Sequence, residues 1–318
     1  MNTPLLLPFQ SVSFSGLAPG ARLVVLGAVH GNETCGTQAI RRVIGEIEAG
    51  QLGIVAGQVS FVPVTNPLAY VRGQRNGDRN LNRNLAPTDA PAEFEDRIAN
   101  WLCPLLAAHD ALLDLHSFHT AGEPFVMLGP EDNVGALEPF ARAHEETALA
   151  LGLGVYRCVD GWLDTYAAGV ARRAAAGASA READVRYGIG TTEFMRSRGG
   201  IALTLECGQH DDPAAPEVAY RAIHRALAHL RLSAAPVPAP VAQMEALRLY
   251  QVVDRTHPGD TFVRPWASFD PVAANEIIGT RHDGMPVRAG SGGYIVFPNP
   301  GAQAGQEWFY LARRSTRV

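Results

Sequence analysis

Short apolar runs alternate with longer stretches of helical periodicity along the first 232 residues of the chain. The apolar runs predict strands at residues 23–29, 59–64, 111–115 and 201–205, and the periodic stretches predict helices at 34–48, 93–108 and 216–232. In the second helix, one face carries Phe94, Ile98, Trp101, Leu102 and Leu105. Because strands and helices alternate, we predict an α/β fold whose central sheet is covered by helices on both faces.

The pattern changes after residue 232. Residues 233–241 (SAAPVPAPV) are small residues and prolines, a composition typical of a linker. Beyond it, short strands are predicted at 247–253, 275–280, 294–297 and 307–311, with glycine-containing turns between them. We therefore predict a larger domain over residues 1–235 and a small all-β domain over 236–318, which could act as a lid. The alanine-rich segment 173–183 is expected to be an exposed helix or a mobile loop.

Composition and charge narrow the class of protein. With 318 residues and 47% hydrophobic content, the chain can bury a full core. A formal net charge of −5 gives no reason to expect a nucleic acid or an anionic membrane as partner. No apolar run reaches the length of a membrane span, residues 1–8 lack the basic start of a secretory signal, and the four cysteines show no C-x-x-C spacing. These features favour a cytoplasmic protein, for which a homo-oligomer is an open alternative.

The chain contains no lysine, so all 27 basic residues are arginine. This absence excludes a Schiff-base lysine and the pyridoxal chemistry that depends on it. It also excludes a Walker A phosphate loop, and no G-x-S-x-G nucleophile elbow is present.

A histidine and a glutamate follow the first predicted strand closely. His30 and Glu33 stand three residues apart on the turn that leaves the strand, where an α/β sheet places its ligands. Imidazole nitrogen and carboxylate oxygen are both good Zn²⁺ ligands, and a catalytic zinc site uses three protein ligands and one open position. Taken alone, the two residues could also only cap the following helix.

The third ligand is predicted to be His116, which follows the strand at 111–115. Asp114 lies two residues earlier, on the same side of the strand, and could accept the second N–H of the ligating imidazole. His119 is the rival ligand. Cys35 and Cys207 adjoin the site in sequence and are expected to be buried fillers, although either could be a ligand.

Glu206 is the candidate general base because it follows the apolar strand at 201–205. Burial at such a position raises the pKa of a carboxyl group toward the range that suits a general base. Glu193 competes for this role.

The loop at residues 72–83 (RGQRNGDRNLNR) holds four arginines and three asparagines. A planar guanidinium suits two-point binding of a carboxylate. Arg72 and Arg79 are expected to be solvated, whereas Arg75, Asn82 and Arg83 are the better candidates for a site.

Four ordered motifs together resemble one known family. They are His30-Gly31-Asn32-Glu33, Asp78-Arg79-Asn80-Leu81-Asn82-Arg83, Asp114-Leu115-His116 and Glu206-Cys207-Gly208. These motifs are similar to those of the succinylglutamate desuccinylase and aspartoacylase family, which are zinc amidohydrolases related to the zinc carboxypeptidases. The resemblance covers nearly the whole chain and implies a mixed central sheet of the zinc-carboxypeptidase type. It also implies one zinc held by His30, Glu33 and His116, with Glu206 as the general base.

The resemblance further implies roles for several substrate-binding residues. Arg75 would lie near the scissile carbonyl, and Asn82 with Arg83 would grip a substrate carboxylate. An arginine shortly before the catalytic glutamate contacts substrate in some members, and either Arg196 or Arg198 could match it.

One feature departs from the aspartoacylase branch, which uses a tyrosine from the C-terminal domain. Residues 298–306 (PNPGAQAGQ) contain none at the expected place. Tyr294 and Tyr310 are the remaining candidates.

The sequence thus predicts a zinc-dependent enzyme that hydrolyses the amide bond of a small N-acyl amino acid, releasing a carboxylate and the free amino acid. The alternative enzyme is a zinc carboxypeptidase that acts on a peptide or peptidoglycan fragment, which would need an open groove. A third interpretation is a non-catalytic metal-binding module. It predicts an incomplete site, whereas ligands, base and arginines are all present.

Overall fold

The computed structural model describes residues 8–135, 137–175 and 184–318 of the chain. Residues 1–7 and most of the alanine-rich segment lie outside the described residues, so the expectations for them stay predictions. The helices are α1 (Cys35–Glu48), α2 (Pro67–Arg72), α3 (Phe94–Ala107), α4 (Ala143–Gly152), α5 (Trp162–Ala175), η1 (Val185–Gly188), α6 (Thr191–Ser197) and α7 (Ala215–His229).

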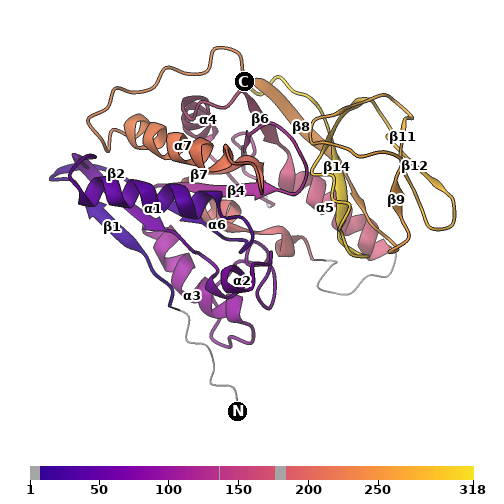
Figure 1. Ribbon diagram of the computed structural model, residues 1–318, viewed down its shortest axis with the longest axis horizontal. Helices are drawn as coiled ribbons and strands as arrows, with labels where there is room; N and C mark the ends of the chain where they lie inside the picture. The colour runs from indigo at the N-terminus through magenta and orange to yellow at the C-terminus, as the bar shows by residue number, and fades with distance from the viewer. Residues whose placement is uncertain (1–7, 136, 176–183) are drawn as a thin grey trace.

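The strands are distributed along the whole described chain (Figure 1). They are β1 (Val12–Ser15), β2 (Ala18–Gly27), β3 (Ala56–Val62), β4 (Ala111–Phe118), β5 (Phe125–Met127), β6 (Arg157–Asp160), β7 (Ile201–Gln209), β8 (Glu245–Asp254), β9 (Thr261–Phe262), β10 (Pro271–Val272), β11 (Ile277–Thr280), β12 (Pro286–Arg288), β13 (Gly293–Val296) and β14 (Glu307–Arg314). Every strand and helix predicted from the sequence is present, with shifted ends. The prediction missed the short elements β1, β5, β6, β9, β10, β12, α2 and η1 and the helices α4, α5 and α6.

Eleven strands form one sheet in the order β1-β3-β2-β4-β7-β5-β6-β8-β14-β13-β10. Strands β3, β2, β4 and β7 run parallel to one another. By contrast, β5 is antiparallel to β7, and β14 is antiparallel to β8. The sheet is therefore mixed, as the sequence predicts.

Helices cover both faces of the parallel strands. On β2, Leu23 and Val25 pack in a core with residues of α1 and α7, whereas Val24 and Leu26 pack in a second core with residues of α3 and α6. Figure 1 shows α1 and α7 on one side of the sheet and α3 on the other. All four β2 side chains are fully buried, and burial of each contributes roughly 1.5–3 kcal/mol.

Two strands extend beyond their predicted ends. β4 continues to Phe118 and β7 to Gln209, so His116 and Glu206 lie within strands. The expectation that they follow the strands was wrong. Their polar side chains are buried next to other ionisable groups, so polarity does not mark the strand end here.

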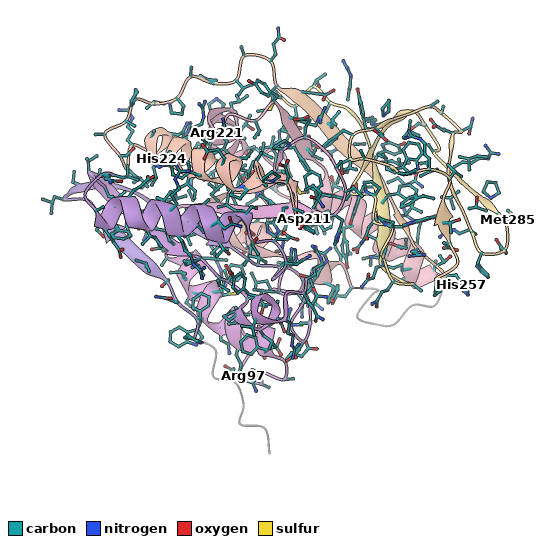
Figure 2. The ribbon with its side chains drawn as sticks, in the orientation of Figure 1. Arg97, Asp211, Arg221, His224, His257 and Met285 are labelled. Atoms are coloured by element: carbon teal, nitrogen blue, oxygen red, sulfur yellow. The ribbon has the colours of Figure 1, made fainter. Side chains whose placement is uncertain are left out.

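The C-terminal strands extend the main sheet. β8 pairs in parallel with β6, and β14, β13 and β10 follow it outward. β9, β11 and β12 form a separate small sheet, and Figure 2 shows His257 and Met285 at that edge of the molecule, far from His224 on α7. A small β region therefore follows the α/β part, and the boundary between residues 235 and 236 stays a prediction. None of the helices in the described parts of the chain is both long and apolar enough to cross a bilayer.

Candidate metal centre and active-site cavity

The site forms at the carboxyl ends of the parallel strands β2, β4 and β7. After β2 the chain turns through Ala28, which has a left-handed backbone (φ 47°), and then presents His30. A Cβ atom on Gly31 would lie 2.0 Å from the carbonyl carbon of Ala69 in α2. Only glycine permits this close approach, so α2 and the turn that carries His30 pack directly together.

His30, Glu33 and His116 come together as one buried group. Glu33 Oε1 lies 2.9 Å from His30 Nδ1, and Glu33 Oε2 lies 2.8 Å from His116 Nδ1. One ligand atom from each residue lies within 4.8 Å of the other two. The structure therefore brings together the three residues that the sequence proposed as metal ligands.

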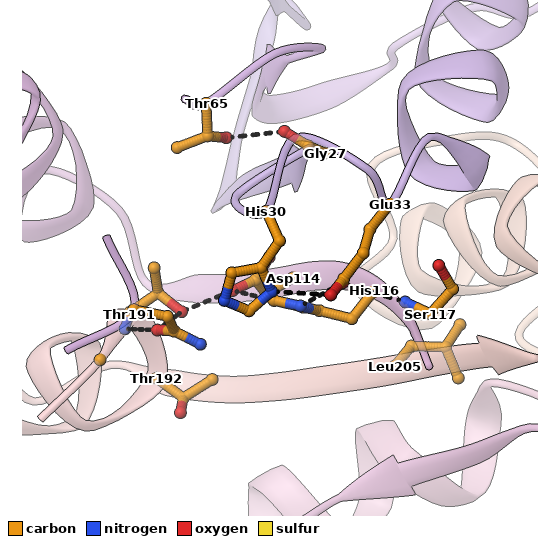
Figure 3. A network of polar contacts seen from close by, with 12 residues as sticks. Gly27, His30, Glu33, Thr65, Asp114, His116, Ser117, Thr191, Thr192 and Leu205 are labelled. Atoms are coloured by element: carbon orange, nitrogen blue, oxygen red, sulfur yellow. Dashed lines mark hydrogen bonds and ion pairs between the residues drawn. The ribbon is translucent and has the colours of Figure 1, made fainter. Parts of the chain in front are cut away.

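The second nitrogen of each imidazole lies near an oxygen atom of another residue. His30 Nε2 lies 3.1 Å from Asn80 Oδ1, and His116 Nε2 lies 3.0 Å from Asp114 Oδ2. With the proton on Nε2 in both rings, the lone pair on each Nδ1 points to the shared space beside Glu33 (Figure 3). This arrangement fixes the tautomers that a metal requires.

The charges of the three residues depend on one another. Burial and the nearby Arg75 lower the pKa of His30 to about 4, so this imidazole is neutral near pH 7. Burial opposes the charge of Glu33, but the two histidines hold its pKa well below the usual value. Burial also favours neutral His116, yet the carboxylates of Asp114 and Glu33 raise its pKa well above the usual value. Two buried carboxylates thus require positive charge between them.

The residues fit a divalent metal ion on two grounds. Within the described part of the chain, His30 Nδ1 is a buried atom without a hydrogen-bond partner, although Glu33 Oε1 is close by. The donor set is two imidazole nitrogens and one carboxylate, which is the three-ligand composition of catalytic zinc sites.

A chain of hydrogen bonds supports the group from behind. Thr191 Oγ1 donates to Asp114 Oδ2 at 2.5 Å, and Thr191 N donates to Asn82 Oδ1 at 2.8 Å. The start of α6 therefore positions Asp114 behind His116 (Figure 3). It also positions Asn82 in the arginine loop. Sequence analysis missed Thr191, because nothing local in the sequence marks its contact with residues over seventy positions away.

Glu206 lies on β7 directly opposite His116 on β4. Burial raises the pKa of Glu206 to about 8. Its Oε2 atom is buried and has no hydrogen-bond partner among the residues that the structure describes. Without a cation beside it, a carboxyl group with this pKa carries its proton at pH 7. A divalent ion at the neighbouring His30, Glu33 and His116 group would favour the carboxylate, which is the form that takes a proton.

The rival ligands occupy other positions. His119 is exposed, and its ring packs edge-on against His210 with the centroids 4.7 Å apart. The Cys35 thiol donates to the backbone oxygen of His116 at 3.4 Å, and the Cys207 side chain is fully buried. Sequence analysis did not single out His210, whose Nδ1 lies 2.8 Å from Ser117 Oγ beside the metal group.

The arginine loop divides into structural and cavity residues. Arg75 reaches the metal group, where its Nη1 lies 2.8 Å from Glu33 Oε1. Arg79 was expected to be solvated, but it is buried and bound to Asp96 and to the backbone oxygen of Arg83. The expectation failed because α3 supplies the opposite charge. Arg72 is partly exposed and binds the backbone of Gly77.

Asn82 and Arg83 both face the cavity. Asn82 uses its carbonyl oxygen on Thr191, so its amide N–H groups can donate to a ligand. Arg83 Nη2 lies 3.4 Å from Glu307 Oε1, and its guanidinium lies over the ring of Trp162 at 4.9 Å. Glu307 belongs to the C-terminal β14 and was not anticipated from the sequence.

The two alternative arginines before β7 differ in position. Arg196 is buried, and its Nε, Nη1 and Nη2 atoms bind Glu146, Glu138 and the backbone oxygen of Ala202. Arg198 is exposed, and its guanidinium contacts the ring of Phe194. The structure does not bring Arg198 into the cavity, whereas Arg196 lies at its wall with its donors engaged.

Glu193, the rival base, closes the first turn of α6. Its Oε2 accepts a hydrogen bond from Gly190 N at 2.9 Å. This capping bond accounts for its burial without any catalytic role.

One cavity of about 590 Å³ joins these groups. Its lining includes His30, Glu33, Arg75, Asn82, Arg83, His116 and Glu206. Residues of the C-terminal region, among them Phe297, Glu307 and Tyr310, complete the wall. The volume lies in the range of small-molecule sites.

Comparison with known proteins identifies the class. Residues 19–128 match the sequence profile of the succinylglutamate desuccinylase/aspartoacylase catalytic domain. These residues include all three members of the candidate metal group. No curated protein sequence matches the chain.

Solved structures share the fold over nearly the whole chain. A succinylglutamate desuccinylase/aspartoacylase from Rhodobacter sphaeroides is 17% identical with a TM-score of 0.72, covering 96% of this chain and 90% of that one. The ectoine utilization protein EutE (DoeB) from Ruegeria pomeroyi, in a product-bound structure, is 17% identical with a TM-score of 0.70, covering 95% and 88%. Succinylglutamate desuccinylase from Vibrio cholerae is 18% identical with a TM-score of 0.70, covering 96% and 85%.

The mixed sheet with its helices is thus the fold of zinc-carboxypeptidase-like proteins. Residues 19–128 are similar to the catalytic domain of the succinylglutamate desuccinylase/aspartoacylase family, so the comparison supports this family over that part of the chain. The resemblance stated from the sequence motifs is confirmed.

Proposed function

We propose that this protein is a zinc-dependent hydrolase that cleaves the amide bond of an N-acyl amino acid. The observation that carries the proposal is the buried His30, Glu33 and His116 group with the carboxylate of Glu206 on the adjacent strand. The match of residues 19–128 to the succinylglutamate desuccinylase/aspartoacylase catalytic domain supports the type of reaction.

His30 and His116 would hold the ion through Nδ1 and Glu33 through its carboxylate, which leaves a position open. When bound, zinc supplies a water of lowered pKa and polarises a carbonyl group. Asp114 keeps His116 in the required tautomer from its position 3.0 Å behind the ring.

Glu206 would act as the proton carrier of the reaction. It takes a proton from the attacking water, whose oxygen forms a bond to the amide carbon. It then gives that proton to the nitrogen as the C–N bond breaks, so the products are a carboxylate and a free amine. Its buried and unpaired Oε2 atom supports this role within the part of the chain that the structure describes.

Three polar residues would orient the substrate. Arg75, which reaches the metal group, would donate to the oxygen that gains negative charge at the scissile carbonyl. Asn82 and Arg83 would bind the carboxylate of the amino acid. Binding the amino-acid carboxylate at two points fixes where the scissile amide of the same substrate lies. The amide carbonyl is thereby positioned for attack.

The volume of the cavity suits a small substrate. The space of about 590 Å³ is walled by the C-terminal Phe297, Glu307 and Tyr310 as well as by the α/β part. A carboxypeptidase acting on long chains would need a groove that passes this wall. The wall also supports a role of residues 236–318 as a lid.

An amine-release screen tests the proposal. Zinc-loaded protein is assayed with acetyl, succinyl and longer-acyl amino acids, and with dipeptides of the same amino acids for comparison. We expect amine release from at least one acyl series and none from the same protein after chelation of zinc. Faster cleavage of the dipeptides would instead favour a carboxypeptidase, and no cleavage of any compound would contradict the proposal.

A further inference from the structure

One part of the cavity wall carries an ion pair within the protein itself. Arg83 and Glu307 both line the cavity, with Arg83 Nη2 3.4 Å from Glu307 Oε1. The guanidinium proposed to bind the substrate carboxylate is therefore already balanced by a carboxylate of the chain. A ligand at this part of the wall meets one positive and one negative group.

A second ion pair stands next to the first. Arg173 Nη1 lies 3.1 Å from both carboxylate oxygens of Asp254. Asp254 on β8 and Glu307 on β14 lie directly opposite each other in the sheet. The two ion pairs together carry no net charge, so they add no general attraction to a substrate with several carboxylates.

Aromatic rings line the same part of the cavity. The ring centroid of Trp162 lies 5.4 Å from that of Tyr310 and 5.8 Å from that of Tyr166. Tyr310 is 4% exposed, and across the described residues its Oη is a buried atom without a hydrogen-bond partner. The guanidinium of Arg83 lies over the rings of Trp162 and Tyr166, whereas the carboxylate of Glu307 and the free phenol oxygen of Tyr310 suit a cationic donor such as an ammonium group.

Building on the proposed function, we infer that the substrate is the N-acyl derivative of an amino acid with a cationic side chain. Its carboxylate binds Arg83, and its ammonium group donates to Glu307 and Tyr310. The positive charges of Arg83 and the substrate ammonium group then alternate with the negative charges of the substrate carboxylate and Glu307. A second carboxylate at the same place would face Glu307 as a like charge, which disfavours N-acyl derivatives of dicarboxylic amino acids.

Three substrates of similar length test the inference. Zinc-loaded protein is assayed with Nα-acetylornithine, Nα-acetylglutamine and Nα-acetylglutamate, whose side chains are cationic, neutral and anionic. We expect kcat/KM to be highest for the ornithine derivative and about tenfold or more below it for the glutamate derivative. Glu307→Gln lowers the ratio of kcat/KM for the ornithine derivative to kcat/KM for the glutamine derivative about tenfold.

Glu245→Gln is the matched control variant. Glu245 is also a strand glutamate paired with an arginine, Arg157, and its side chain is 29% exposed against 28% for Glu307. It does not belong to the cavity lining. We expect Glu245→Gln to rank the three substrates by kcat/KM in the same order as the wild type does. Tyr310→Phe removes only the phenol oxygen and is the second variant, with a selective loss expected for the ornithine derivative.

Binding of the free amino acids gives a readout that needs no turnover. Ornithine should raise the Tm of the zinc-loaded protein more than glutamine or glutamate does, and Glu307→Gln should remove the difference. An equal or larger Tm rise with glutamate, or an equal loss on all three substrates in Glu307→Gln, would overturn the inference. Failure to cleave any acyl amino acid would count against the proposed function, while the Tm order still decides the inference.

Discussion

His116 on β4 and Glu206 on β7 are direct neighbours across two parallel strands, and both side chains face the cavity. The third proposed ligand and the proposed base therefore stand on adjacent backbones that hydrogen bonds hold in register. A site built on strands keeps its geometry better than one built on loops. This relationship gives the first two predictions below.

Replacing His116 by alanine should remove most bound zinc. The remaining His30 and Glu33 would supply two ligands where zinc needs three. Elemental analysis of metal-reconstituted protein measures the zinc content, with His119→Ala as the control that keeps about one zinc per chain. Full occupancy in His116→Ala would place the third ligand elsewhere.

Replacing Glu206 by glutamine should separate metal binding from turnover. Glutamine keeps the shape but cannot carry a proton, so we expect unchanged zinc content and a fall in kcat of roughly 10²–10⁴-fold. Steady-state kinetics measures the fall. Glu193→Gln retains an acceptor for Gly190 N and should keep near-normal kcat. Near-normal turnover of Glu206→Gln would move the role of base to another residue.

Replacing Asp114 by asparagine should weaken zinc binding without removing a ligand. Asp114 Oδ2 faces His116 Nε2 and accepts from Thr191 Oγ1. An amide in its place no longer stabilises the imidazole that binds the metal, and loss of such a partner costs about 10–100-fold in affinity. Competition with a chromogenic chelator measures the zinc Kd, and an unchanged Kd would contradict the supporting role of Asp114.

Converting the substrate carboxylate to an amide should lower kcat/KM of the wild type far more than it lowers kcat/KM of the Arg83→Ala variant. One charge-assisted hydrogen bond contributes about 1.5–3 kcal/mol, which corresponds to roughly 10–100-fold in kcat/KM. The measurement compares kcat/KM for free and blocked substrate in both proteins. Arg72→Ala, which alters an exposed arginine of the same loop, should behave as the wild type does. Equal cleavage of free and blocked substrate by the wild type would exclude Arg83 as the carboxylate receptor.

Asp260 should stabilise the C-terminal region through a charge that is lost only in strong acid. Its buried carboxylate accepts from Arg281 Nη1 at 2.7 Å and from the backbone N–H groups of Thr256 and His282. Burial opposes its ionisation, but these donors hold its pKa well below the usual value. Because the pKa is lower in the folded state, the stabilisation is complete above the unfolded pKa of about 3.9 and disappears as the pH falls through the folded pKa.

Asp260→Asn should therefore lower the free energy of unfolding by roughly 1–3 kcal/mol at pH 7. The difference from the wild type should shrink below about pH 4. Urea unfolding at several pH values measures it, with the exposed Asp283→Asn as control. A difference that stays constant down to pH 2 would show that the charge of Asp260 is not its source.

The main elements could be predicted from the sequence because their signals are local. The apolar run before His30 fixes β2, and the spacing of Phe94 to Leu105 fixes one face of α3. The metal group was predictable for the same reason, since His30 with Glu33 and Asp114 with His116 are short motifs whose spacing follows from a turn and a strand.

Contacts between distant segments could not be predicted in this way. From the sequence, Arg79 was predicted to be a solvated loop residue. In the structure, Asp96 on α3 binds the Arg79 side chain, which is buried. β4 and β7 run past His116 and Glu206 because neighbouring polar groups accompany those residues inside the sheet. Arg196 and Arg198 are two positions apart and equivalent by motif, and only the packing of α6 separates a buried residue from an exposed one.

The sequence by itself thus determined the class of fold and the residue types of the site, because periodicity and motif spacing act over a few residues. Only the tertiary structure decided what surrounds each site residue. Thr191 behind Asp114 and Glu307 beside Arg83 come from segments 77 and 224 positions away. Such pairs form because strand order and helix packing bring those segments together, and no local pattern in either segment specifies its partner.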